Sequence, residues 1–153
     1  MTTNTQTYQV QPYEYEPAAN AYLMSIAGIV CGLPLPIVNT TASIIYFLAR
    51  RKSSYFIRWH ALQALLAQLV VMPFNSLLLG WTISIFIKNG EFSERAIRFG
   101  KDIPQLYWAY LIFIIIINIF EFIAVITASS DIHKGKNVRF LGIATITDVL
   151  CRK

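Results

Sequence analysis

Residues 59–87 read WHALQALLAQLVVMPFNSLLLGWTISIFI and contain no formally charged side chain. A helix that crosses a membrane needs about 20 mostly apolar residues, so this stretch predicts a transmembrane helix over 60–87. The stretch 106–129 carries a single charged side chain, Glu121, and predicts a second transmembrane helix. Its first residues include aromatic side chains of the kind that favour a membrane interface, namely Tyr107, Trp108 and Tyr110.

Another hydrophobic stretch, 20–49, precedes these two and is interrupted by Pro34 and Pro36. As one helix it would be about 45 Å long, which exceeds the ~30 Å hydrocarbon core of a bilayer. Proline removes a backbone donor and breaks a helix. One interpretation is a single kinked or tilted span, and the other is a hairpin of two half-helices, about 21–33 and 37–49. We favour the hairpin, which must be covered by protein because neither half can cross alone.

The composition agrees with lipid as the main solvent. Of the 153 residues, 56% are apolar and 14% are charged, whereas soluble domains are about 45–50% apolar and about 25% charged. The sequence therefore predicts an all-α fold, a polytopic transmembrane helical bundle, with a single membrane domain over 20–150. It has three or four membrane segments, depending on whether the break at Pro34 and Pro36 makes a kink or a hairpin. Residues 1–19 are polar and predict a disordered N-terminal tail.

The charged side chains set the expected orientation, because all but Glu121 lie outside the predicted spans. The segment 50–59 has four basic and no acidic residues, and the tail 131–153 has five basic residues. Lys and Arg in short loops favour the cytoplasmic side, so we expect 50–59 and the C-terminus to be cytoplasmic. The apolar residues between 140 and 150 can lie at the cytoplasmic interface.

The most informative string, 55–68, reads YFIRWHALQALLAQ and leads into the stretch 60–87. It follows a basic run and alternates aromatic side chains with Arg58, as expected at a membrane interface. The helix then enters the apolar stretch while carrying His60 and Gln63. Small and polar side chains on one helix face are typical of helix–helix contacts in lipid, so we expect this string to contact other helices.

This string resembles the Tic-twenty-like family, which comprises the chloroplast inner-envelope import channel subunit and its bacterial membrane-protein relatives. The resemblance rests on an aromatic–Ile–Arg–aromatic–His–Ala–x–Gln–Ala pattern, whose main positions here are Phe56, Arg58, Trp59, His60, Gln63 and Ala64. Chloroplast members often have an acid where this chain has Gln68. The resemblance implies a protein of the bacterial cytoplasmic (inner) membrane that works in a larger complex, in protein translocation or membrane-protein biogenesis.

The single charge inside a predicted span, Glu121, lies about 12 Å from the expected cytoplasmic end of its helix. We expect it to belong to one intramembrane polar layer, made of Asn39, Ser43, Gln68, Asn118 and Glu121. An acid in a span marks a functional site by default, because a charge is costly in lipid. Two interpretations stay open: hydrogen bonds that only hold the helices together, and a polar conduit or partner contact.

No motif in the sequence indicates catalysis, a cofactor or a metal, and we expect a non-enzymatic protein. The chain has no nucleophile elbow and no Gly-rich phosphate loop. His60 and His133 are far apart, and no cluster of His, Cys and carboxylate has ligand spacing. Cys31 and Cys151 do not make the pattern of a disulfide framework. The excess of basic residues does not indicate nucleic-acid binding, because no motif for it is present.

The leading functional hypothesis is a non-enzymatic subunit of a membrane complex, in contact with the lipid bilayer and with other integral membrane proteins. The alternative is a small homo-oligomeric channel or transporter whose polar layer lines a path. Membrane proteins that co-purify with the chain would favour the first hypothesis. A self-assembled oligomer that conducts in liposomes would favour the second.

Overall fold

The computed structural model describes residues 9–27, 36–88 and 104–151, and within these ranges the regular structure is entirely helical. The elements in chain order are α1 (Pro12–Leu23), the 3₁₀ turn η1 (Met24–Ile26), α3 (Pro36–Arg50), α4 (Tyr55–Lys88), α5 (Gln105–His133) and α6 (Ile143–Cys151). The all-α class that the sequence predicts is confirmed.

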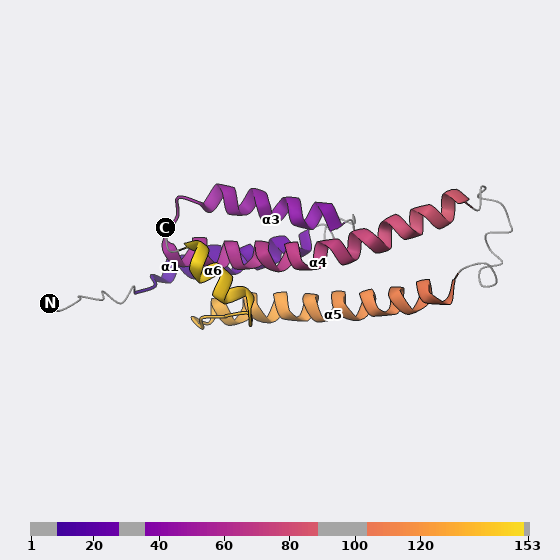
Figure 1. Cartoon of the computed structure of the whole chain (residues 1–153). Coiled ribbons are helices and arrows are strands. Elements are labelled where there is room, and N and C mark those ends of the chain that lie inside the picture. Colours follow the sequence, from indigo (N-terminus) through magenta and orange to yellow (C-terminus); the bar gives the residue numbers. More distant parts are fainter. Residues whose placement is uncertain (1–8, 28–35, 89–103, 152–153) are drawn as a thin grey trace.

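Two long antiparallel helices, α4 and α5, extend over the whole length of the helical bundle (Figure 1). They contain the predicted stretches 60–87 and 106–129 and extend both of them. In the described part of the chain, the segment Tyr55–Ile85 of α4 and the whole of α5 are the two helices long and apolar enough to cross a membrane. Two of the three or four predicted membrane segments are therefore present as helices of sufficient length.

The hydrophobic stretch 20–49 folds into two short antiparallel pieces, α1 with η1 and then α3. The 15 residues of α3 make a helix about 22 Å long, which is too short to cross a bilayer. The Tyr46 hydroxyl of α3 donates a 2.6 Å hydrogen bond to the Pro17 carbonyl of α1. The second half of the predicted hairpin, about 37–49, is therefore present as α3, whereas its first half, about 21–33, is described only as far as residue 27. Pro36 is the first residue of α3, whereas Pro34 lies outside the described residues.

Residues 12–19, which the sequence predicts as part of a disordered tail, belong to α1. Pro12 opens this helix at a position where its missing N–H needs no partner. The Gln11 N–H donates a 2.7 Å hydrogen bond to the Glu14 carboxylate in a capping box. The prediction was wrong here because α1 buries mainly alanines, which add little hydrophobicity to a polar sequence. Residues 1–8 lie outside the described residues.

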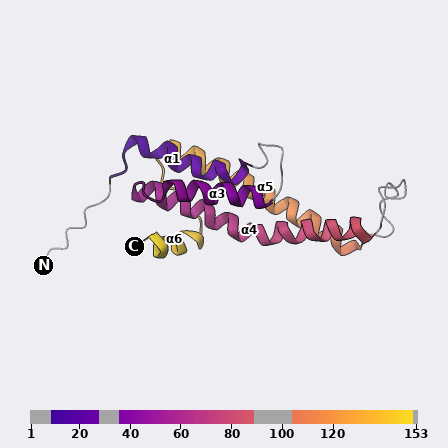
Figure 2. The same ribbon diagram turned by 90° about the horizontal axis from the view of Figure 1, so that it is seen from above.

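The short helices gather at one end of the α4–α5 pair, where α4 begins and α5 ends (Figure 1). There α1 packs on both long helices, α3 packs mainly on α4, and α6 packs on α4 on the side away from α1 (Figure 2). The core at this end contains many small side chains, namely Ala18, Ala19, Ala21, Ala61, Ala64 and Ala128. Small residues let helix backbones approach closely, which is how helices pack in lipid.

Pro73 lies in the interior of α4, and the ribbon of this helix bends part-way along its length (Figure 1). Proline removes one backbone hydrogen bond and its ring displaces the preceding turn, which is the usual cause of such a bend. The bend separates the half of α4 that carries the short helices from the half that continues beyond them.

Two glycines shape the chain between α5 and α6. Gly135 has a φ of +79°, a left-handed conformation that glycine adopts without strain. Its N–H donates to the Ile132 carbonyl (2.9 Å), and the Lys136 N–H donates to the Asp131 carbonyl (3.0 Å), which closes the end of α5. Gly142, with a φ of +78°, makes a second left-handed step just before α6. The chain therefore turns back along the bundle before α6 begins.

Candidate functional site

Gln63 is the centre of a buried hydrogen-bond network that joins α4 to α1 and to the return segment, as we call residues 134–142. Its side chain is 0% exposed. The Nε2 atom donates to the Tyr22 hydroxyl (2.6 Å) and to the Val138 carbonyl (3.2 Å), and Oε1 accepts from the Phe140 N–H (3.2 Å). The side-chain amide thus pairs with the backbone of the return segment as a neighbouring peptide group would.

His60 joins this network through Tyr22, whose hydroxyl lies 2.9 Å from His60 Nδ1. The Tyr22 oxygen also accepts from Gln63, so one phenol group links the imidazole to the amide. His60 Nε2 is buried without a hydrogen-bond partner among the described residues. The imidazole packs edge-on against Phe56 and Trp59, with centroid distances of 4.5 and 4.9 Å.

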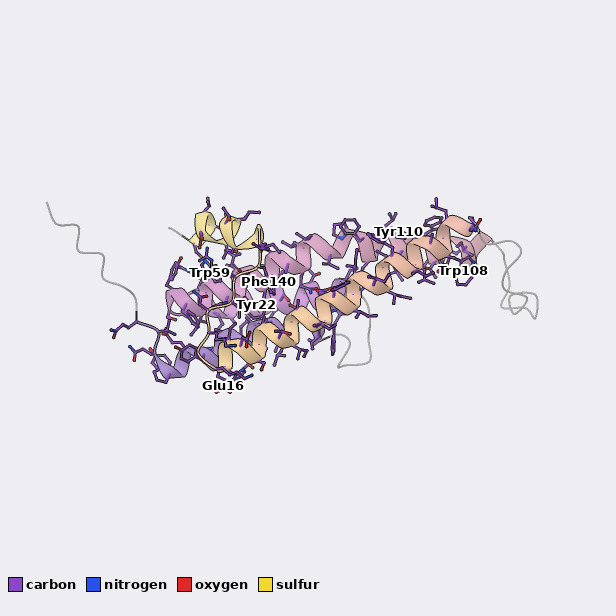
Figure 3. All side chains as sticks on the ribbon, turned by 90° about the horizontal axis from the view of Figure 1, so that it is seen from below. Glu16, Tyr22, Trp59, Trp108, Tyr110 and Phe140 are labelled. Carbon is purple, nitrogen blue, oxygen red and sulfur yellow. The ribbon has the colours of Figure 1, made fainter. Side chains whose placement is uncertain are left out.

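Trp59 and Arg58, in the first turns of α4, bind α6. The Trp59 Nε1–H donates a 2.8 Å hydrogen bond to the Asp148 carboxylate, which also forms an ion pair with Arg139. The Arg139 guanidinium carbon lies 5.1 Å from the centroid of the Trp59 ring, at cation–π distance. The Arg58 guanidinium donates to the Cys151 carbonyl (3.3 Å) at the end of α6. Figure 3 shows Tyr22, Trp59 and Phe140 together at this end of the bundle.

The remaining residues of the predicted string also contact parts of the same chain. The Phe56 ring packs edge-on against Tyr15 of α1, at a centroid distance of 5.7 Å. Ala64 is 1% exposed and lies in the core that α1, α4 and α5 share. The string 55–68 therefore holds both terminal regions of the chain, α1 and the return segment with α6, against the start of α4.

Polar side chains also link α4 to α5 along their length. Gln68 Nε2 donates to the Glu121 carboxylate. Further along, Asn75 and Asn118 exchange two side-chain hydrogen bonds, of 3.2 and 2.8 Å. Each of these groups is partnered within the chain, so both pairs stabilise the contact between the two long helices.

A third polar contact lies near the far end of the two helices. The Thr82 hydroxyl donates to the Leu78 carbonyl (2.8 Å) and lies 2.9 Å from the Tyr107 hydroxyl, from which it accepts. The Tyr107 ring packs edge-on against Trp81, at 5.6 Å between centroids, and Trp81 also lies 6.2 Å from the Tyr110 ring. This end therefore carries an aromatic cluster, as the sequence predicts for a membrane interface; Tyr110 and Trp108 are labelled in Figure 3.

Of the five residues expected to form one polar layer, the structure joins Gln68 and Glu121 by a hydrogen bond. Gln68 and Glu121 are in contact, but Asn118 pairs with an asparagine about 10 Å further along α4. Ser43 and Asn39 lie on α3, which packs mainly on α4, η1 and α1. The Ser43 hydroxyl is buried without a hydrogen-bond partner among the described residues, and Asn39 is half-buried.

Variants of Glu121 separate a structural role from a functional one. Glu121→Gln keeps a hydrogen bond with Gln68 and is expected to leave stability unchanged, whereas Glu121→Leu leaves the Gln68 amide unpaired. For the leucine variant we expect the free energy of unfolding to fall by about 1 kcal/mol, as for other hydrogen bonds between helices in lipid. Unfolding in mixed micelles measures this. The double variant Gln68→Leu/Glu121→Leu should recover most of the loss, and a greater loss in Glu121→Gln than in Glu121→Leu would contradict a structural role.

The titratable and thiol groups of the described residues give no metal centre. No group of three or more His, Cys, Asp or Glu side chains in those ranges could hold a metal ion. Cys151 is buried against α4, and burial raises the pKa of its thiol, so little reactive thiolate is present at neutral pH. His133 Nδ1 lies 2.9 Å from the Ser129 carbonyl at the end of α5. The contacts of Cys151 and His133 therefore indicate roles in packing and hydrogen bonding within the fold.

Sequence reasoning did not identify the partners of the string in the rest of the chain, which are Tyr22, Val138, Arg139, Phe140 and Asp148. The sequence does contain a pattern that could have predicted the polar contacts between α4 and α5. Asn75 and Thr82 follow Gln68 at intervals of seven residues, and that spacing places polar side chains on one face of a helix.

The family comparison covers most of the folded chain. A family model described as the magnetosome magnetite crystal formation protein family, MamF/MmsF, matches residues 18–146. The match runs from the middle of α1 into α6 and includes the string 55–68. No curated protein and no solved structure matches the chain.

The resemblance to the Tic-twenty-like family is therefore wrong, and the role in protein translocation that it implied has no support. It depended on one short string, and the contacts of that string explain its residue types by packing within the chain. The family model instead covers well over half of the sequence. The chain belongs to the MamF/MmsF magnetosome magnetite crystal formation family.

Proposed function

We propose that this protein is a non-enzymatic integral membrane protein that supports magnetite crystal formation, the process for which its family is named, as a structural subunit of a membrane complex. The observation that supports this most strongly is the pairing of polar side chains inside the chain. Gln63 binds α1 and the return segment, Gln68 binds Glu121, and two asparagines bind each other. Polar groups used in this way fix a shape rather than bind a substrate.

The aromatic side chains support a specific placement in the membrane. Trp59 and Trp81 lie near opposite ends of the apolar part of α4, about 33 Å apart along the helix axis, which fits the ~30 Å hydrocarbon core. On this placement α4 and α5 both cross the bilayer. The beginning of α1, the turn between α3 and α4, and the end of α6 then share one side. The basic residues at the turn between α3 and α4, Arg50, Arg51 and Lys52, support a cytoplasmic location for that side.

The homo-oligomeric channel that the sequence left as an alternative receives less support. A conduit needs polar groups that remain available to the transported species. Glu121 instead accepts from Gln68, and Asn75 and Asn118 use each other's amides. We therefore keep the structural subunit as the proposed function.

A complementation experiment tests the proposal. The gene is expressed in a magnetite-forming bacterium from which its own members of this family have been deleted. We expect the protein in the membrane fraction, resistant to carbonate extraction, and we expect magnetite crystals to regain the size distribution of the parent strain in electron micrographs. Crystals that stay as in the deletion strain, despite normal membrane insertion, would refute the proposed role.

Two matched variants connect this experiment to the structure. Gln63→Leu removes the central amide of the network, whereas Gln105→Leu makes the same substitution at an exposed position at the start of α5. The exposed variant should restore crystals as well as the wild-type gene, and the buried variant should restore them poorly. Equal restoration by both would show that the packing of the terminal regions is not needed for the role.

A further inference from the structure

After α5 the chain folds back on itself and forms a hairpin against α4. The return segment leaves the end of α5 and runs back beside α4, where Val138 and Phe140 bind Gln63. The chain then turns at Gly142, and α6 runs back towards the beginning of α4, where its last residue, Cys151, accepts from Arg58. The two pieces form a hairpin that enters and leaves the bundle on the same side.

This hairpin reaches beyond the level of Trp59, which marks the interface on the proposed membrane placement. Gln63 lies about 6 Å further along α4 than Trp59, and it binds the return segment at that depth. Ala144, at the start of α6, belongs to a buried cluster that includes Leu62, and Leu66 packs against this cluster. The two leucines lie about 4.5 and 10.5 Å further along α4 than Trp59. The turn between the two pieces is therefore the part of the hairpin that lies furthest into the bundle.

One face of the hairpin is apolar and uncovered by the described residues. The inward face of α6 is buried and consists of Ala144, Thr147 and Cys151. The outward face consists of large apolar side chains that are at least half exposed, with Leu141 in the turn 100% exposed: Leu141, Ile146, Val149 and Leu150. In water such a patch would be unfavourable, because each exposed side chain loses the free energy of burial.

Two further observations identify what covers this face. The exposed apolar surface of α4 continues with Leu69 and Val70, one turn beyond Leu66, so the hairpin extends the lipid-facing surface of a long helix. Two basic side chains of the return segment are exposed: Lys136, 64% exposed, pairs with Asp131, and Arg139, 49% exposed, pairs with Asp148. Basic side chains beside an apolar face favour the headgroups of a phospholipid leaflet.

We infer that residues 137–151 form a re-entrant membrane element, whose outer face, from Leu141 to Leu150, contacts the acyl chains of the cytoplasmic leaflet. Non-helical backbone at membrane depth is tolerated where protein supplies its hydrogen bonds. Gln63 does this for the Val138 carbonyl and the Phe140 N–H. The inference gives a physical reason for a buried glutamine in the third turn of α4, and it rests on the membrane placement proposed above.

Fluorescence quenching by brominated lipid tests the inference. The full chain, with Cys31→Ser and Cys151→Ser as background, receives single cysteines by Leu141→Cys, Val149→Cys, Lys136→Cys or Leu77→Cys, each labelled with bimane. The proteins are reconstituted into vesicles of equal parts phosphatidylcholine and phosphatidylglycerol, with or without bromine on the acyl chains. We expect about a twofold or greater loss of fluorescence at positions 141 and 149, and little loss at 136.

The variant at Leu77, an exposed position on the far half of α4, separates the inference from the placement on which it rests. Quenching at 77 without quenching at 141 and 149 would overturn the inference and leave the membrane placement intact. Absence of quenching at 77 as well would overturn both. Cross-links between protomers through position 141 or 149, in place of quenching, would show that a second copy of the chain covers this face and would also overturn the inference.

Discussion

Replacing Gln63 with leucine is expected to lower the free energy of unfolding by about 3 kcal/mol and the Tm in detergent by about 6–12 °C. Leucine has a similar volume but makes none of the three hydrogen bonds of the amide. The Tyr22 hydroxyl, the Val138 carbonyl and the Phe140 N–H would all lose a buried partner, at about 1 kcal/mol or more each. Thermal unfolding followed by circular dichroism measures the change.

The same variant is expected to release the return segment. Lys136 and Arg139 are trypsin sites within this segment, and cleavage requires the local chain to open. We therefore expect Gln63→Leu to be cleaved there faster than the wild-type protein under limiting trypsin. Gln105→Leu, at an exposed site, is the control and should change neither Tm nor cleavage. A Gln63→Leu protein with wild-type Tm and cleavage rate would show that the network contributes nothing to stability.

The long helices were predictable from the sequence because their formation depends on a property of each segment alone. A run of more than 20 apolar residues forms a helix in lipid whatever its neighbours are, since lipid cannot satisfy the backbone. The stretches 60–87 and 106–129 are therefore found in α4 and α5. The break near Pro36 was predictable for the same reason, because proline acts on its own backbone.

The terminal regions were not predictable in this way, because their structure depends on tertiary contacts. The beginning of α1 is polar, and its buried face is made mostly of alanines. Alanines stabilise a helix contact only where another helix approaches closely. The return segment has no regular structure of its own and is fixed by a side chain more than 70 residues away, Gln63. The string 55–68 was recognised as unusual, but its contacts with both termini became visible only in three dimensions.

Because α1, α4 and α5 approach closely, we expect Ala64→Leu to lower the free energy of unfolding substantially. Ala64 is 1% exposed and packs in a core that includes Ala18 of α1 and Ala128 of α5. A leucine adds three heavy atoms where neighbouring side chains are themselves small, so at least one helix must move away. Overpacking of this kind costs about 1–3 kcal/mol, and we expect the upper part of that range because three helices meet here.

The matched control is Ala124→Leu, which adds the same atoms to α5 at an exposed position. Because Ala124 faces away from the core, this variant should change the free energy of unfolding by less than about 0.5 kcal/mol. Unfolding of both variants in mixed micelles gives the comparison. The displaced helix in Ala64→Leu should be α1, because its few turns are bound less firmly than the 29 residues of α5. Faster hydrogen exchange confined to α1 would support this, whereas equal stability of the two variants would show that the helices do not meet at Ala64 as closely as the structure places them.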